Sequence, residues 1–324
     1  MLAIDQGTTG STCLVIAADG RVVGRGYREI PQHYPQPGWV EHDPHDLWRC
    51  TLEAARAAIA QANVMPDAIG ITNQRETVVM WDRATGDPVS RAIVWQDRRT
   101  ADRCAELQPR SEWIADRTGL VVDPYFSGTK LEWLLARDDR AARAARGDLL
   151  AGTVDSWLVW QLTGGLVHAT DPTNASRTML FDITTMRWSE ELCALFGVPM
   201  SMLPEVRPSG GSFGVTRREH LGAEIPIVGM AGDQQAALYG QGCWEAGDGK
   251  NTYGTGAFLL LNTGARRARA GGAGEGGGLL TTVACDARGA PAYALEAAIF
   301  IAGAAVQWLR DGLGIIGAAA ETEA

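Results

Sequence analysis

One pattern occurs twice in this chain, and it constrains the fold more than any other feature. Near the start, the apolar stretch Leu2–Asp5 leads through a turn of glycine and threonine into a second apolar stretch, Cys13–Ala17. Late in the sequence, Asn251–Gly256 contains a similar turn and leads into the apolar stretch Ala257–Leu261. Apolar stretches joined by a short glycine-containing turn predict a β-hairpin. We therefore expect two related hairpins.

The elements after the first turn have a recognisable order. A third strand is expected at Arg21–Tyr27, followed by a helix that starts at Pro44, with Asp43 as its N-cap, and continues to about Ala62. A short buried strand is expected at Ala68–Thr72. Antiparallel strands, a helix and then another strand predict a mixed sheet with helices on its faces.

The second turn begins the same order again. Strand candidates at Leu279–Cys285 and Ala292–Leu295 follow it, then a helix from about Ile299 to Arg310, near the end of the sequence. We therefore expect an incomplete second copy of the first domain. The other expected elements are strands at Glu76–Trp81 and Ala92–Trp95 and helices at Lys130–Arg146 and Ser156–Leu162.

Length and composition bound the class of protein. A chain of 324 residues suits two domains, which we place at residues 1–240 and 241–324. The net charge of -9 argues against a broad nucleic-acid surface. Six cysteines without C-x-x-C spacing indicate reduced thiols in a cytoplasmic protein. The apolar stretch Ala297–Val306 is too short to span a bilayer and is expected to form a buried helix, so no membrane insertion is predicted.

The repeated turns suggest a ligand. Two facing domains that each offer such a turn to a shared cleft form the actin-like ATPase arrangement, in which backbone N–H groups and hydroxyls hold nucleotide phosphates. Taken alone, Asp5–Thr9 is also compatible with a plain hairpin turn. Its repetition at Tyr253–Gly256 favours phosphate binding.

Longer stretches give the sequence a family resemblance. The matching stretches are Asp5–Thr9, Pro37–Pro44, Gly70–Thr77, Ala92–Gln96, Asp123–Lys130, Thr170–Leu180, Gly232–Ala237, Asn251–Gly256 and Gln307–Asp311. In this order they resemble the glycerol kinases of the FGGY family of carbohydrate kinases. The resemblance implies an α/β fold of duplicated actin-like (ribonuclease H-like) domains, the second incomplete because the family continues past this C-terminus. It also implies ATP-dependent phosphorylation of glycerol, with Mg²⁺.

The resemblance assigns a substrate site. Its residues would be Arg75, Glu76, Trp95, Tyr125, Asp233, Gln234 and Phe258. Arg75 and Glu76 would bind two hydroxyls, one as donor and one as acceptor, and Trp95 and Phe258 would form an apolar wall. From the residues alone, an adjacent Arg-Glu pair is usually a solvated surface feature, and the two aromatic residues suit ordinary core packing. Tyr125 directly follows a proline and also suits a plain turn.

The resemblance also assigns a base, a metal site and a nucleotide site. Asp233 would be the catalytic base, and Asp5 would hold Mg²⁺ through water together with Asp233. Nucleotide contacts would come from Thr8, Thr9, Gly10, Thr255, Gly303 and Gln307. Asp233 also suits the N-cap of the following helix; the two interpretations are compatible, because a helix N-terminus favours an ionised carboxylate. The family usually has an arginine where this chain has Thr12, which removes one phosphate-binding charge.

The sequence therefore predicts a kinase whose partners are glycerol and ATP or ADP, and an assembly of identical chains is compatible with it. Two alternatives stay open. One is another sugar kinase of the same family, such as a xylulose or gluconate kinase, although Arg75 and Glu76 with Trp95 favour glycerol. The other is a non-catalytic fragment that binds glycerol or a partner subunit.

Overall fold

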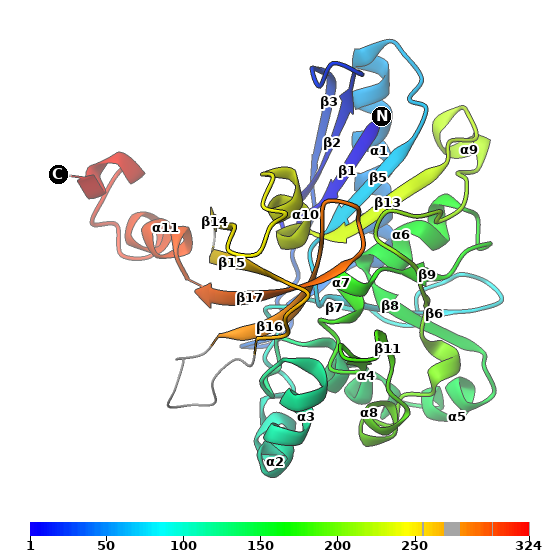
Figure 1. Cartoon of the computed structure of the whole chain (residues 1–324), viewed down its shortest axis with the longest axis vertical. Coiled ribbons are helices and arrows are strands. Elements are labelled where there is room, and N and C mark those ends of the chain that lie inside the picture. Colours follow the sequence, from blue (N-terminus) through cyan, green and yellow to red (C-terminus); the bar gives the residue numbers. More distant parts are fainter. Residues whose placement is uncertain (255, 269–278, 300, 324) are drawn as a thin grey trace.

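The computed structural model describes residues 1–254, 256–268, 279–299 and 301–323 (Figure 1). Its first sheet has the strand order β3-β2-β1-β5-β13. These strands are β1 (Leu2–Gln6), β2 (Gly10–Ile16), β3 (Val22–Glu29), β5 (Ile69–Asn73) and β13 (Ile227–Gly232). Strands β1, β2 and β3 are antiparallel neighbours, whereas β1, β5 and β13 run parallel. The predicted first hairpin and mixed sheet are confirmed.

Helix α1 (Pro44–Ala62) packs closely on one face of this sheet. Asp43 is its N-cap, as predicted. Gly24 and Gly26 of β3 allow the close approach, because a Cβ at either position would lie 2.1 Å or 2.0 Å from a backbone carbonyl oxygen of α1. The side chains between the two layers belong to the largest buried cluster of the described residues, which continues to helix α6 (Val154–Leu162) and a second sheet.

A second, smaller sheet and a group of helices complete the first 240 residues. Its order is β4-β7-β6-β8, formed by Glu41–His42, Ala92–Ile93, Val78–Asp82 and Leu149–Thr153. The helices are α2 (Ala101–Leu107), α3 (Ser111–Thr118), α4 (Ser127–Leu135), α5 (Arg140–Ala145), α6 (Val154–Leu162), α7 (Pro172–Ala175), α8 (Glu190–Leu195), α9 (Arg218–Leu221) and α10 (Asp233–Gly240). Short strand pairs join β9 (Ala169–Thr170) to β12 (Glu205–Val206) and β10 (Phe181–Asp182) to β11 (Arg187–Trp188).

Two predictions in this part were wrong in detail. The helix expected at Lys130–Arg146 is interrupted between α4 and α5, where Asp138 has a φ of 50° that no α-helix continues through. The strand expected from Glu76 begins only at Val78, because Glu76 has a φ of 62°. This left-handed residue turns the chain immediately before β6.

The second region has a four-stranded antiparallel sheet of order β14-β15-β17-β16. Its strands are β14 (Gly249–Tyr253), β15 (Ala257–Gly264), β16 (Leu280–Cys285) and β17 (Pro291–Ile299). The recurring hairpin is confirmed as β14–β15. The strand that pairs next to β15 is β17, and β16 lies beyond it. Strand β14 was not predicted as an element, because its sequence is polar.

The expected helix from Ile299 to Arg310 was wrong at its start. Ile299 ends β17, and helix α11 spans Gly303–Asp311. The stretch expected to be a buried helix is instead largely open to solvent, with Ile301 69% exposed. In Figure 1, α11 and the short 3-10 turn after it (Ala319–Glu323) extend away from the rest of the molecule. Across the described ranges, no helix is long and apolar enough to cross a membrane.

Candidate active site

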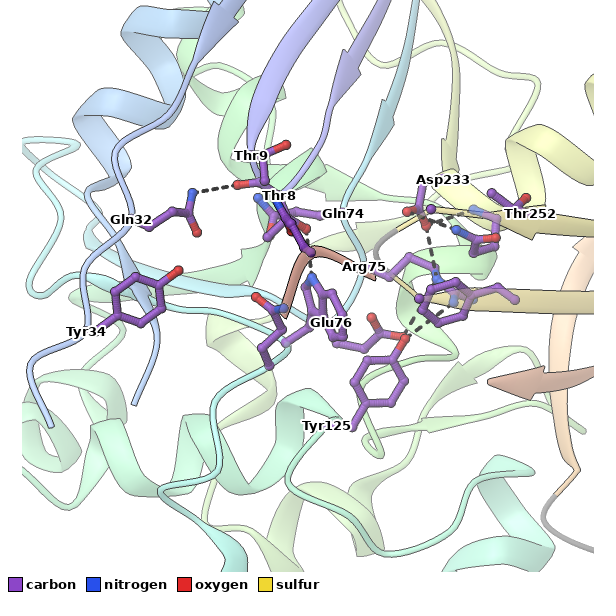
Figure 2. A pocket seen from close by; sticks show the side chains of 17 residues that line it. Thr8, Thr9, Gln32, Tyr34, Gln74, Arg75, Glu76, Tyr125, Asp233 and Thr252 are labelled. Carbon is purple, nitrogen blue, oxygen red and sulfur yellow. Dashed lines mark hydrogen bonds and ion pairs between the residues drawn. The ribbon is translucent and has the colours of Figure 1, made fainter. Parts of the chain in front are cut away.

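A cleft of about 460 Å³ lies where the two regions meet, and it is lined by both hairpin turns. Its lining residues are Thr8, Thr9, Gln32, Tyr34, Gln74, Arg75, Glu76, Trp95, Gln96, Tyr125, Asp233, Gln234, Thr252, Gly254, Gly256, Phe258 and Gln307. All seven residues assigned to the substrate are among them. Figure 2 shows Thr8 and Thr9 of the first turn on one side of this space, and Asp233 and Thr252 on another.

Three described residues assigned to nucleotide or metal do not line this cleft. Asp5 and Gly10 do not line this cleft. Gly303 also stays outside the lining, but its N–H donates to the carbonyl oxygen of Gly254 at 2.9 Å, which fixes the start of α11 against the second turn. Thr255 lies outside the described residues.

The wall of the cleft next to Arg75 is a buried network of charges. Arg75 and Glu76 are 2% and 1% exposed, so the interpretation as a solvated surface pair is wrong. Arg75 donates through Nη1 to Glu296 Oε2 at 2.6 Å, and its Nε lies 3.2 Å from Asp233 Oδ1. Arg177 donates through Nε to Glu76 Oε1 at 2.6 Å and through Nη2 to Glu296 Oε1 at 2.7 Å. Two arginines and two glutamates thus alternate inside the protein.

The network determines the protonation of its acids. Burial alone would raise the pKa of Glu296, but Arg177 and Arg75 oppose it and hold that pKa at about 2. For Glu76, burial raises the pKa more than Arg75 and Arg177 lower it. Glu296 is therefore ionised at neutral pH and accepts from both arginines as a carboxylate.

Asp233 lies at the exposed end of this network. It is the first residue of α10, and Gly232 is the N-cap, so the prediction that Asp233 is the cap was wrong by one position. Its Oδ1 accepts from the N–H of Gln234 at 2.8 Å. With 37% of its side chain exposed, Asp233 is open to the cleft while paired with Arg75. An ionised carboxylate in this position can accept a proton from a bound hydroxyl.

Aromatic side chains form the apolar wall. The Trp95 ring lies edge to face with Tyr125 at 5.7 Å and with Phe258 at 6.4 Å between centroids. Trp95 Nε1 also donates to Thr8 Oγ1 at 2.8 Å, which joins this wall to the first turn. Burial raises the pKa of Tyr125, so its phenol stays neutral, and Arg75 Nη2 donates to its oxygen at 3.4 Å.

The acids near the first turn suit a divalent cation. Asp5 is partly exposed, but many protein atoms surround its carboxylate. This burial, and then the charge of Asp233, raise the pKa of Asp5 to about 6. A cation beside Asp5 would offset the burial and the nearby negative charge that disfavour the ionised form of this carboxylate. The described residues contain no group of three or more side chains suited to a metal. Mg²⁺ commonly needs only one or two protein carboxylates beside substrate phosphates, so this pair fits it.

Residues 1–240 match the N-terminal domain of the FGGY family of carbohydrate kinases. This match covers well over half of the chain. The chain belongs to the FGGY family.

Individual FGGY relatives match almost the whole chain. A glycerol kinase of Cereibacter sphaeroides is 57% identical over 99% of this chain and 65% of its own length. Glycerol kinase 2 of Thermotoga maritima is 54% identical over 100% of this chain and also 65% of its own length. The chain thus spans about 65% of the length of the curated relatives it matches.

Solved structures of FGGY kinases share the fold. Plasmodium falciparum glycerol kinase with ADP has a TM-score of 0.90 and 36% identity, covering 99% of this chain and 64% of that one. Xylulose kinase from Rhodospirillum rubrum has a TM-score of 0.82 at 24% identity, covering 97% and 63%, which supports the fold alone. The predicted actin-like α/β fold is confirmed.

Several polar residues of this FGGY site were not assigned from the sequence, and three of them make charged contacts beside the cleft. Arg177 and Glu296 complete the buried network, and Lys250 of β14 contacts the residue after Asp233. Lys250 Nζ donates to Gln234 Oε1 and, at 2.7 Å, to Thr252 Oγ1, while burial and then Arg75 lower the pKa of Lys250 to about 8. Glu296 did carry a signal, because it is a lone charge in the otherwise apolar stretch Tyr293–Ile299. The sequence gives no comparable signal for Arg177.

Proposed function

We propose that this cleft phosphorylates glycerol, transferring the γ-phosphoryl group of ATP to give glycerol 3-phosphate and ADP. The observation that carries the proposal is the Arg75–Asp233 pair, 3.2 Å apart, between an aromatic wall and two hairpin turns. Hydroxyl-binding charges, an apolar wall and phosphate-binding turns are the parts that such a reaction needs.

Glycerol suits the substrate side of the cleft. It is small and neutral, so its hydroxyls need donors and acceptors while its carbon atoms need an apolar surface. Arg75 supplies fixed donors, and Glu76 supplies an acceptor when ionised. The rings of Trp95, Tyr125 and Phe258 supply the surface, and Gln234 adds an amide beside Asp233.

Asp233 acts as the base. Its partly exposed carboxylate accepts the proton of the attacking hydroxyl, and its contact with Arg75 holds it in place at the edge of the cleft. Phosphoryl transfer depends mainly on positioning and charge stabilisation, with the base orienting the nucleophile. The rigid setting of Arg75 and Asp233 serves that purpose.

The nucleotide lies along the two turns. Thr8, Thr9 and Gly10 contact it from the first region, and Thr255, Gly303 and Gln307 from the second. Asp5 and Asp233 would hold Mg²⁺, which would neutralise charge on the phosphates. Two similarities support this assignment: the relatives from Cereibacter and Thermotoga are glycerol kinases, and the Plasmodium glycerol kinase structure contains ADP.

The proposed activity belongs to a protein with two domains, at residues 1–240 and from 241 onward. All six cysteines are free, which supports a reducing compartment such as the cytoplasm.

A substrate panel tests the proposal. ADP release from Mg-ATP is measured with glycerol, xylulose and gluconate, for the wild type and for Arg75→Ala. We expect glycerol to be preferred. Arg75→Ala should weaken glycerol use by about 1–3 kcal/mol, because hydroxyls and buried acids lose their donor. Arg146→Ala, which removes an arginine with 60% of its side chain exposed, is the control and should act as wild type.

Other outcomes of the panel would overturn the proposal. Equal or better use of a five-carbon sugar would assign the site to another sugar kinase. Binding of glycerol without any ADP release would mean that the cleft binds glycerol but does not catalyse its phosphorylation.

A further inference from the structure

We propose that Glu296 is a positioning residue: it sets the orientation of Arg75 for glycerol, so the substrate site is complete only when the second region is in place. This inference rests on the proposed function of the cleft. Glu296 is fully buried and contributes nothing to the cleft lining, so it acts through Arg75.

Glu296 holds the guanidinium of Arg75 by two contacts. Its Oε2 accepts from Nη1 at 2.6 Å, and its Oε1 accepts from Nη2 at 3.3 Å. Such a two-point contact fixes the plane of the guanidinium as well as its position. The remaining Nε edge then lies 3.2 Å from Asp233, and Nη2 reaches the Tyr125 oxygen at 3.4 Å.

Arg177 holds the other side of the same carboxylate. It bridges Glu296 and Glu76 at 2.7 Å and 2.6 Å, and none of its side chain is exposed. Removing one acid would therefore leave two buried arginines facing a single carboxylate. Arg75 would then be drawn toward Asp233 or Glu76, the acids expected to face glycerol.

The two partners of Glu296 come from the other region. Arg75 follows β5, and Arg177 follows α7, whereas Glu296 lies in the middle of β17 and pairs with Leu260 on one side and Leu280 on the other. A shift of the second sheet would move this carboxylate away from both arginines. The orientation of Arg75 therefore depends on whether the second sheet is docked against the first region.

Glu296→Gln tests the inference, because it keeps the shape and one acceptor oxygen but places an N–H group against an arginine. We expect the dissociation constant for glycerol, measured by calorimetry, to rise about tenfold or more. ADP affinity should change by less than about twofold, since the turns are untouched. Glu296→Asp keeps the charge and should recover part of the loss. Glu245→Gln, at an exposed acid of the second region, is the matched control.

A second measurement separates positioning from stability. The ¹⁵Nε–H signal of Arg75, assigned with Arg75→Lys, should be protected from solvent exchange in the wild type and lose that protection in Glu296→Gln. If that variant does not fold, Glu296→Asp provides both measurements and should show the intermediate effect. Unchanged glycerol affinity and unchanged protection in a folded variant would overturn the inference.

The same two measurements distinguish failure of the proposed function from failure of the role inferred for Glu296. If the wild type binds no glycerol, the assignment of the cleft is wrong, and so is a role of Glu296 in glycerol binding. The exchange measurement then still shows whether Glu296 orients Arg75. If the wild type binds glycerol and Glu296→Gln binds it equally well, only the role of Glu296 is wrong.

Discussion

The two regions of this molecule are held together internally in different ways. In residues 1–240, α1 covers one sheet so closely that only glycine fits at two positions of β3, and a large apolar cluster fills the space between. In the second region the corresponding cluster is small: Cys243, Leu260, Ala284 and Ala294 pack with Leu238 of the first region. Apolar side chains of its strands are open to solvent, including Leu259 at 43% and Ile299 at 61%.

Polar contacts join the regions in addition to apolar packing, such as that of Val283 with Phe181 and Ile183. Gln235 donates to Thr282 Oγ1 at 3.2 Å and to the Val283 carbonyl at 3.0 Å, and Tyr293 donates to the Ile183 carbonyl at 2.8 Å. Together with Glu296, these contacts dock the second sheet. The first region therefore provides a rigid frame, and the second completes the site through a few directional bonds.

The largest effect on this arrangement is expected for Arg177→Met. The change leaves Glu76 and Glu296 buried with one arginine fewer, and breaking a buried ion pair typically costs about 3–5 kcal/mol. The free energy of unfolding, measured by denaturant titration, should fall by that amount. Arg146→Met is the control and should change it by less than about 0.5 kcal/mol. A loss below about 1 kcal/mol for Arg177→Met would mean that the network does not dock the regions.

A pH titration isolates the contribution of Glu296. Its pKa is lowered from 4.5 to about 2, so its charge stabilises the fold above pH 4.5, and this stabilisation disappears as the pH falls toward 2. The stabilisation amounts to about 3 kcal/mol. The difference in unfolding free energy between wild type and Glu296→Gln should therefore narrow as the pH falls below 4.5. A difference that stays constant down to the lowest pH at which both fold would contradict this account.

A smaller effect is expected for a change in the packing of α1 on β3, which tests the rigidity of the first region. In Gly26→Ala the new Cβ would lie 2.0 Å from a carbonyl oxygen of α1, and such overpacking typically costs about 1–3 kcal/mol. Gly70→Ala in β5 is the matched control, because no atom lies within 4 Å of its Cβ position. Thermal unfolding should separate the two variants clearly. Equal melting temperatures would show that α1 and β3 can move apart at little cost.

The sequence predicted those parts of the fold whose signals are local. The two apolar stretches of the first hairpin with their glycine and threonine turn, and the Asp43-Pro44 start of α1, are read from neighbouring residues, and both are confirmed. The interruption at Asp138 and the left-handed Glu76 were missed, because side chains other than glycine rarely adopt a positive φ.

The site was predictable only as far as family motifs extend. The resemblance picked out the seven substrate residues that the cleft brings together. It did not reveal that Glu296 and Arg177 meet, because their contact joins positions far apart in the sequence and depends on how the two regions dock. Lys250 was missed for a different reason: a lysine in a polar strand is normally solvated, whereas this one is buried.

The most direct test of the central claim is the rate of phosphoryl transfer to glycerol by Asp233→Asn. Asparagine keeps the shape of Asp233 but cannot accept the proton, and loss of a general base typically costs about 10² to 10⁴ in rate. We expect that loss in kcat, with glycerol and ADP affinities within about threefold of wild type and an unchanged melting temperature. Asp286→Asn, at the β16–β17 turn, is the control. Turnover by Asp233→Asn within a few-fold of the wild type would contradict the assignment of this cleft as a glycerol-phosphorylating site with Asp233 as its base.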